Sequence, residues 1–134
     1  MLKRDIEAIK VYKQAIGIEP DLHGVHASLG DAYFRLGLYH EALNSYKEEI
    51  RRHPDSYMTY WWLGSAYGML DRRYDEIEAY KQAIRIKPDY ARAHFSLGLT
   101  YAIIGEIDLA LREYRILKDL DEEWAKTLFK TIYK

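Results

Sequence analysis

Hydrophobic residues recur along this chain at steps of three and four positions, in blocks separated by short polar turns. Two successive blocks show the spacing: Val25, Leu29, Ala32, Tyr33 and Leu36, then Ala42, Leu43, Tyr46 and Ile50. This spacing is typical of amphipathic helices, because it places the apolar side chains on one face. Gly37, between the two blocks, indicates a turn. The pattern therefore predicts pairs of helices joined by short turns.

The helix pairs repeat with a constant period. The step from Pro20 to Pro54 equals the step from Pro54 to Pro88. Other columns keep the same step: Leu29-Gly30, Leu63-Gly64 and Leu97-Gly98, then Tyr33, Tyr67 and Tyr101, then Tyr12, Tyr46, Tyr80 and Tyr114. A period of about 34 residues indicates a helical repeat array. Repeat arrays serve as binding surfaces, so the period indicates the broad function but does not name the ligand.

Two further features predict how each repeat is built. The glycine of each Leu-Gly pair lies in the middle of a predicted helix, where it costs about 1 kcal/mol relative to alanine. We therefore expect the partner helix to approach closely at that point. Each proline is expected to end a helix, and the aspartate after it is expected to cap the next one. These aspartates are Asp21, Asp55 and Asp89.

The second repeat departs from the pattern. Its turn carries Asp71-Arg72-Arg73 in place of a glycine, and Glu76 occupies the column of Ala42 and Ala110. We interpret this as an extra turn residue offset by a lost helix residue. That interpretation predicts a longer turn or a splayed helix pair in this repeat.

The chain ends with a different kind of helix. Glu122 stands in the proline column of the third repeat, and Leu117 stands in its alanine column. A final helix follows, with Trp124, Leu128 and Ile132 on one face. A helix with one apolar face at the end of a stack is typical of a terminal cap, because the last repeat has no neighbour to cover it.

The beginning of the chain supplies only the second helix of a repeat, from Leu2 to Ile18. An apolar strip then lacks its normal contact, which favours self-association, with a homodimer through this helix as one outcome. The strip contains Ile6, Ile9, Val11 and Ile16. The other interpretation is that the chain is a piece of a longer protein. As one domain, the chain divides into an unpaired helix at 1–20, repeats at 23–56, 57–90 and 91–121, and a capping helix at 122–134.

Composition and charge bear on the classes of partner and on the location of the protein. A formal net charge of −1 and a pI near 6.5 give no field that would attract nucleic acid or an anionic membrane, so we expect neither as a partner. The sequence shows no apolar stretch long enough to span a bilayer and no apolar signal segment. With no cysteine in addition, we expect a cytoplasmic protein.

The sequence gives no support for catalysis. It contains no glycine-rich phosphate loop, nucleophile elbow or zinc-protease motif, so we expect no enzyme activity and no cofactor. His23 and His26 share a helix face, but a third ligand is not evident and we expect no metal site. His26 is assigned to the core, and His40 and His53 are assigned to solvated turns.

The repeated columns Leu-Gly, Tyr, Ala, Tyr, Ala and Pro resemble the tetratricopeptide repeat (TPR), and the segment from Tyr74 to Ile84 is close to its consensus. One column departs, because His26, Tyr60 and His94 replace the usual tryptophan. The resemblance implies an all-α, right-handed superhelical solenoid of helix-turn-helix hairpins. It also implies that the first helices line a concave groove, where members of the family mostly bind peptides or protein segments.

This resemblance assigns a set of groove residues that is largely apolar and aromatic. The set is Ala27, Asp31, Phe34, Arg35, Met58, Trp61, Trp62, Ser65, Met69, Arg92, Phe95, Leu99 and Ile103. Because Trp61 and Trp62 are adjacent, they point about 100° apart on a helix and cannot both face one core neighbour. We expect at least one of them to be partly exposed as a binding anchor. Arg35 and Arg92 are expected to flank this surface and to take a carboxylate or the C-terminal end of a helix.

The predicted partner is a protein or peptide with apolar anchors. The chaperone-binding members of the family hold a C-terminal carboxylate with lysine, asparagine and arginine on three first helices. Of the corresponding residues here, only Arg92 is compatible and Asp31 repels a carboxylate, so we predict no binding of chaperone tails. An amphipathic helix laid in the groove suits these residues better. A self-assembling structural module, joined through the N-terminal helix, is the alternative function.

Overall fold

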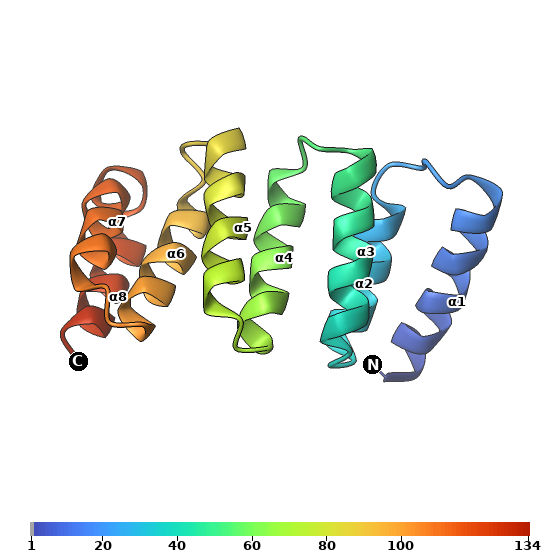
Figure 1. The fold of residues 1–134 in the computed structure, drawn as a ribbon, viewed down its shortest axis with the longest axis horizontal. Coiled ribbons are helices and arrows are strands. Elements are labelled where there is room, and N and C mark those ends of the chain that lie inside the picture. The colour runs from blue at the N-terminus through green and yellow to red at the C-terminus, as the bar shows by residue number, and fades with distance from the viewer. Residues whose placement is uncertain (1) are drawn as a thin grey trace.

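The structure, a computed structural model, describes residues 2–134, and this range contains eight α-helices and no strand. The helices are α1 (Leu2–Ile18), α2 (Val25–Arg35), α3 (Tyr39–Arg52), α4 (Tyr57–Met69), α5 (Arg73–Ile86), α6 (Ala91–Ile103), α7 (Ile107–Leu120) and α8 (Glu122–Ile132). They follow one another along the long axis of the molecule (Figure 1). The predicted all-α solenoid of helix hairpins is confirmed. Within the described range, no helix has the length and hydropathy needed to cross a membrane.

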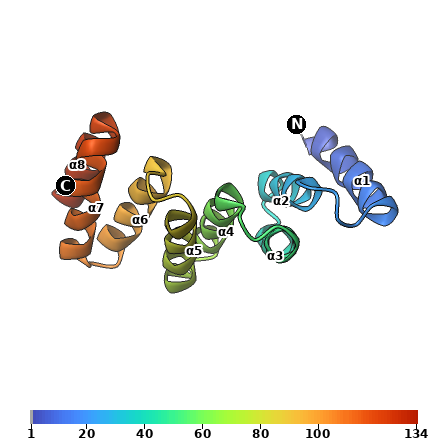
Figure 2. The ribbon, with the colours of Figure 1, turned by 90° about the horizontal axis from the view of Figure 1, so that it is seen from above.

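The hairpins α2/α3, α4/α5 and α6/α7 form a curved stack. Seen from above, α2, α4 and α6 lie on one side and α3 and α5 on the other (Figure 2). The two end helices, α1 and α8, rise toward the side of α2, α4 and α6, which is therefore the inner side of the curve. Neighbouring hairpins are joined by contacts of α3 with α4 and of α5 with α6. We call the side formed by α2, α4 and α6 the inner surface.

A tyrosine ring lies against a glycine in each of the first two hairpins. A Cβ added to Gly30 would lie 2.6 Å from the ring of Tyr46, and one added to Gly64 would lie 2.5 Å from the ring of Tyr80. Both rings are buried. The close approach expected at these glycines is therefore confirmed, and burial of the ring offsets the unfavourable helix propensity of glycine.

In the last hairpin, a side chain of α8 covers the helix glycine in place of a tyrosine of the repeat. Leu128 of α8 lies on Gly98, where an added Cβ would be 2.6 Å from its side chain. Tyr114, which has the repeat position of Tyr46 and Tyr80, instead packs against Phe129 of α8 with the ring centroids 5.2 Å apart. Leu128 has no exposed surface. α8 thus covers the end of the stack with its apolar face.

The prediction of a longer turn in the second hairpin is wrong. All three hairpin turns have the same length, at 36–38, 70–72 and 104–106. Asp71 has φ 57° and takes the left-handed conformation of Gly37 and Gly105, which aspartate tolerates better than most residues. Glu76 fits the alanine column because Gly68 leaves room for its carboxylate, which lies 2.5 Å from where a Cβ on Gly68 would be. The repeat register is therefore unbroken.

The prediction that Asp21, Asp55 and Asp89 cap the following helices is also wrong. The N-cap residues are Gly24, Ser56 and Tyr90, and none of them makes a side-chain cap hydrogen bond. At the start of α2, the carboxylate of Glu49 from α3 instead accepts hydrogen bonds from the N–H groups of Gly24 and Ala27. Asp121 does cap a helix, because it accepts from the N–H of Trp124 in the first turn of α8.

Gly64→Ala is expected to lower the free energy of unfolding by about 1–2 kcal/mol, because crowding of the buried Tyr80 ring exceeds the gain in helix propensity. Gly17→Ala is the matched control, since a Cβ added in α1 at this position meets nothing within 4 Å. The control is expected to raise stability by up to about 1 kcal/mol. Urea unfolding followed by circular dichroism measures both changes. Equal effects of the two substitutions would contradict the packing described for Gly64.

Candidate functional site

A row of aromatic side chains crosses the inner surface from one hairpin to the next. The ring of Phe34 on α2 packs edge-on against Trp62 on α4, with centroids 5.5 Å apart. Trp62 packs against its neighbour Trp61 at 4.9 Å, and the indole N–H of Trp61 donates to the Ser96 hydroxyl on α6 at 2.9 Å. We call Phe34, Trp62 and Trp61 the aromatic row. It links all three inner helices.

The two tryptophans can bridge the hairpins because they are adjacent on one helix. Side chains of neighbouring residues point about 100° apart, so Trp62 faces α2 while Trp61 faces α6. Trp62 packs at the edge of the core cluster that contains Leu63 and Tyr67, and Trp61 packs at the edge of the cluster that contains Tyr80. Both indoles are half-buried, and each keeps part of its surface open to solvent.

The two arginines of the predicted groove have different surroundings. The guanidinium of the exposed Arg92 lies over the ring of Trp61, 5.0 Å from its centroid, as in a cation–π contact. Arg35 donates instead to the buried carboxylate of Asp5 on α1 at 2.8 Å, and this hydrogen bond raises the pKa of the guanidinium. Arg35 is exposed as well, but its charge is paired with Asp5 and fastens α1 to α2, whereas Arg92 carries its charge beside the aromatic row.

The other predicted groove residues divide into exposed and packed side chains. Met58, Met69 and Ile103 are more than half exposed. Ser65 donates to the backbone of Trp61 at 3.1 Å, and Ala27, Phe95 and Leu99 are half-buried, with Phe95 against Trp124 of α8. Asp31 is half-buried and accepts a 2.6 Å hydrogen bond from Tyr46, while burial raises the pKa of its carboxyl.

Three side chains that complete this surface are not in the predicted groove set. They are Ser96, Asp5 and Trp124. Ser96 stands in the repeat column of Trp62, one period later, so the repeat alignment places it on the inner side but gives no sign of its partner. Asp5 and Trp124 belong to α1 and α8, which lie outside the three hairpins. The repeat alignment of the three hairpins therefore does not show their contacts.

Models of known protein families match the same repeats. A model described as a TPR repeat matches residues 4–37 and 76–105, and one described as a tetratricopeptide repeat matches residues 28–76. The chain belongs to the tetratricopeptide repeat family. No curated protein sequence matches it.

Solved TPR structures share the fold over most of the chain. A crystal structure of MamA is 27% identical, with a TM-score of 0.81, and the match covers 93% of this chain and 84% of MamA. YrrB, described as a TPR protein with an unusual peptide-binding site, is 16% identical, with a TM-score of 0.79 and coverage of 97% and 77%. The first TPR of Spaghetti (RPAP3), bound to the HSP90 peptide SRMEEVD, is 21% identical, with a TM-score of 0.76 and coverage of 81% and 88%.

Buried polar pairs lie behind the inner surface of this TPR chain. His94 occupies the column in which the family usually has tryptophan, and its two ring nitrogens lie 2.7 Å from the Glu113 carboxylate and 2.7 Å from the Pro88 carbonyl. Burial lowers the pKa of His94, but the hydrogen bonds to Glu113 and Pro88 and the charge of Glu113 outweigh it, so the net pKa is raised. His26 is buried as predicted and reaches the Pro20 carbonyl in the same way.

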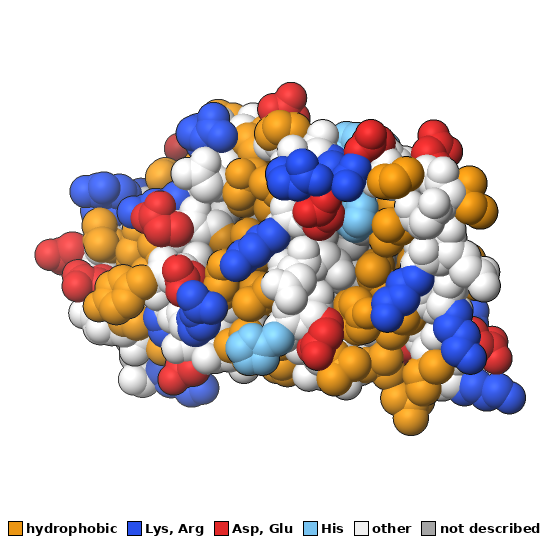
Figure 3. Space-filling view, turned by 45° about the vertical axis from the view of Figure 1, so that its right-hand side comes forward, with side chains coloured by type: hydrophobic (Ala, Val, Ile, Leu, Met, Phe, Trp, Pro, Cys, Tyr) orange, Lys and Arg blue, Asp and Glu red, His pale blue; other side chains and the backbone are white. Residues whose placement is uncertain are grey.

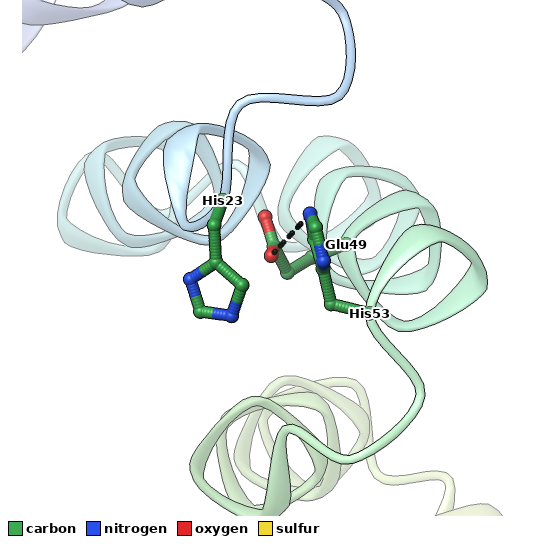
Figure 4. Close-up of side chains that lie close together, drawn as sticks. All are labelled: His23, Glu49 and His53. Carbon is green, nitrogen blue, oxygen red and sulfur yellow. Dashed lines mark ion pairs between the residues drawn. The ribbon is translucent and has the colours of Figure 1, made fainter.

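One group of side chains in residues 2–134 has the composition and spacing of a metal site. His23, Glu49 and His53 lie together beside the start of α2 (Figure 4). The assignment of His53 to a solvated turn is wrong, because its side chain is 24% exposed and its Nε2 atom is buried. This group lies at the α1–α2 loop and the end of α3, outside the aromatic row.

The His94–Glu113 pair predicts a pH dependence of stability. Because the folded pKa of His94 lies above its ordinary value of about 6.5, the pair stabilises the fold fully below that pH, and this contribution is lost as the pH rises through the folded pKa. Glu113→Ala, which introduces the residue found at Ala79 in the second hairpin, removes the partner. Urea unfolding is measured at a series of pH values from acidic to alkaline. Between the acidic and alkaline ends, the variant is expected to lose less unfolding free energy than the wild type. Equal losses of unfolding free energy in the two proteins would contradict a raised pKa of His94.

Proposed function

We propose that this TPR chain is a non-catalytic binding module that holds a peptide or helical segment of a partner protein across its inner surface. The observation that carries the proposal is the aromatic row, which spans the first two hairpins, reaches the third through the Trp61–Ser96 hydrogen bond and keeps both indoles partly open to solvent. Tryptophan and arginine are the residue types most enriched at binding hot spots, and here Arg92 lies directly over Trp61.

Contacts with neighbouring side chains hold the aromatic row in place without a ligand. Trp61 is fixed by its hydrogen bond to Ser96 and by the guanidinium of Arg92, and Trp62 is wedged between Trp61 and Phe34. A ligand therefore loses little affinity to the ordering of these side chains. Met58 and Met69, at the two ends of α4, are exposed and flexible, so they can adapt to the shape of an apolar side chain.

The chemistry of this surface selects among peptide ligands. Apolar and aromatic contacts dominate it, and Arg92 supplies one cation, so we infer a ligand with apolar anchors at helical spacing and an acidic group beside them. Arg35 is already paired with Asp5. The carboxylate of Asp31, which accepts from Tyr46, repels the carboxylate of a ligand. We therefore propose that chaperone tails are not ligands, although the Spaghetti TPR of similar fold binds an HSP90 peptide. The peptide-binding site of YrrB is a second case of peptide recognition on this fold.

Trp62→Ala is expected to abolish most peptide binding. Peptides selected from a phage-displayed random library on the wild-type protein are the probe, and their affinity is measured by fluorescence anisotropy. Loss of a hot-spot side chain costs about 2 kcal/mol or more, so the affinity is expected to fall at least about 30-fold. Arg92→Ala is expected to weaken the binding of acidic peptides more than that of neutral ones, because it removes the cation beside Trp61.

The matched control is Tyr74→Ala, since Tyr74 is an aromatic residue on α5 with 79% of its surface exposed. It is expected to leave the affinity unchanged, and the peptide SRMEEVD is expected not to bind. Circular dichroism melts establish that each variant is folded. Selected peptides that bind a folded Trp62→Ala variant as tightly as wild type would show that the inner surface is not the binding site.

Self-assembly through α1 is a second candidate function, favoured by the exposure of its hydrophobic side chains. α1 packs against α2. Leu2, Ile6, Val11 and Ile18 are 45–86% exposed. Of the predicted strip, Ile9 and Ile16 are half-buried, so Ile6 and Val11 carry its exposed part. Hydrophobic side chains reach the surface among lysines and arginines when this end of the molecule is brought forward (Figure 3).

Val11→Asp is expected to dissociate any oligomer formed through α1, because it places a charge in the centre of the exposed strip. Leu38→Asp, a change at a comparably exposed residue of the first hairpin turn, is the control and is expected to leave the mass unchanged. Light scattering over a wide range of concentrations measures the mass. A wild-type protein that stays monomeric throughout would exclude this second function and leave the first untouched.

A further inference from the structure

Three potential metal ligands converge where the α1–α2 loop meets the end of α3. His23 lies in that loop, Glu49 is in the last turn of α3, and His53 follows α3 directly. One nitrogen or oxygen atom from each lies within 4.8 Å of the others. In Figure 4 the two imidazoles flank the Glu49 carboxylate. His53 Nε2 is 3.8 Å from Glu49 Oε2, and the two imidazole centroids are 4.4 Å apart.

The Glu49 carboxylate is held in a fixed orientation. Only 1% of the residue is exposed, and its Oε2 and Oε1 atoms accept hydrogen bonds from the N–H groups of Gly24 and Ala27 at 3.1 and 3.2 Å. Each carboxylate oxygen keeps a second lone pair for a further interaction. Carboxylates that ligate metals are oriented by outer hydrogen bonds of this kind.

The repeat itself does not require a carboxylate at this position. The residues at the equivalent position of the other repeats are Ala15, Ala83 and Leu117. In the second and third hairpins this position belongs to α5 and α7 and carries an apolar residue, so α4 and α6 begin without a carboxylate from that position. Glu49 is therefore a departure specific to the repeat that also brings His23 and His53 together.

The Nε2 atom of His53 is buried and has no hydrogen-bond partner among residues 2–134. Leaving a buried polar atom unpaired is unfavourable, and native structures rarely do so without a functional reason. The atom faces Glu49 Oε2 across a gap that is too long for a hydrogen bond. A cation between these two atoms would satisfy both.

We propose that His23, Glu49 and His53 bind a divalent transition-metal ion of the zinc class. Two imidazoles and one carboxylate form a ligand set that suits zinc and its late first-row neighbours, whereas magnesium and calcium prefer oxygen ligands. Tetrahedral zinc with bonds of about 2.0–2.2 Å places its ligand atoms about 3.3 Å apart. The His53–Glu49 separation of 3.8 Å is slightly longer than that, and the exposed His23 can approach both groups by rotating its side chain.

The fourth coordination position opens toward solvent. A surface cavity of about 510 Å³ adjoins the site and is lined by both histidines together with Arg52, Tyr57 and Met58. Arg52 does not oppose a bound cation strongly, because its guanidinium is neutralised by ion pairs with Glu48 and Asp21. The open position therefore takes water or a ligand group from solution. With the metal bound, the α1–α2 loop and the end of α3 are joined by coordination bonds.

The test uses the full chain without a histidine tag, stripped of metal by a chelator and then titrated with Zn²⁺ against a chromogenic competitor. One equivalent of Zn²⁺ is expected to bind. His23→Asn and His53→Asn are expected to weaken zinc binding on the order of a hundredfold or more, because each removes one of three ligands. Bound Co²⁺ is expected to give the intense visible absorption of a four-coordinate site. Mg²⁺ is expected not to compete.

His40→Asn is the matched control, since His40 is an exposed histidine at the other end of α3, and it is expected to bind zinc like the wild type. His23 is also exposed, so its replacement does not disturb the core even if that of His53 does. Circular dichroism checks the fold of each variant. Zinc affinity that is unchanged in His23→Asn, or weakened equally in His40→Asn, would overturn the proposal, as would saturation at other than one ion.

Discussion

Contact between a tyrosine ring and a glycine of the facing helix sets the distance between the two helices in the first two hairpins. Tyr46 lies on Gly30 and Tyr80 lies on Gly64, with no room for a Cβ between them. The two helices of the first hairpin and those of the second are therefore held close together by the same contact. That repetition brings Phe34 and the two tryptophans of α4 into line on the inner surface. The aromatic row thus depends on packing that happens on its buried side.

The repeat period predicts most of the fold, because glycine, tyrosine and proline each have a steric role that is visible in sequence. Two wrong interpretations, both in the second hairpin, have a shared cause. Asp71 resembles an inserted residue in the sequence, although aspartate can adopt the left-handed conformation of the glycine it replaces. Glu76 in an alanine column suggests that the helix packing is disrupted, but Gly68 in the preceding helix leaves space for its carboxylate. Compensation between residues that touch only after folding cannot be seen in a column of residue types.

The candidate surface is predictable in its composition and less so in its connections. Adjacent tryptophans on one helix indicate exposure, and both are partly exposed. The partner of Arg35 could not be inferred, because Asp5 lies on α1, whose angle to α2 the repeat does not determine. The histidines show the same limit. His23 and His53 are separated in sequence by the whole first hairpin and meet only because the α1–α2 loop returns to the end of α3.

The way in which α8 closes the stack bears on how proteins of this kind change length in evolution. Leu128 occupies the pocket over Gly98 that a tyrosine of the repeat fills elsewhere, and α8 packs on α6 and α7. The cap therefore recognises the hairpin before it, whatever number of hairpins precede that one. Duplication or loss of a whole repeat before that hairpin leaves the contacts of α8 unchanged. The inner surface can thus be lengthened or shortened by recombination without any change in the packing of α8.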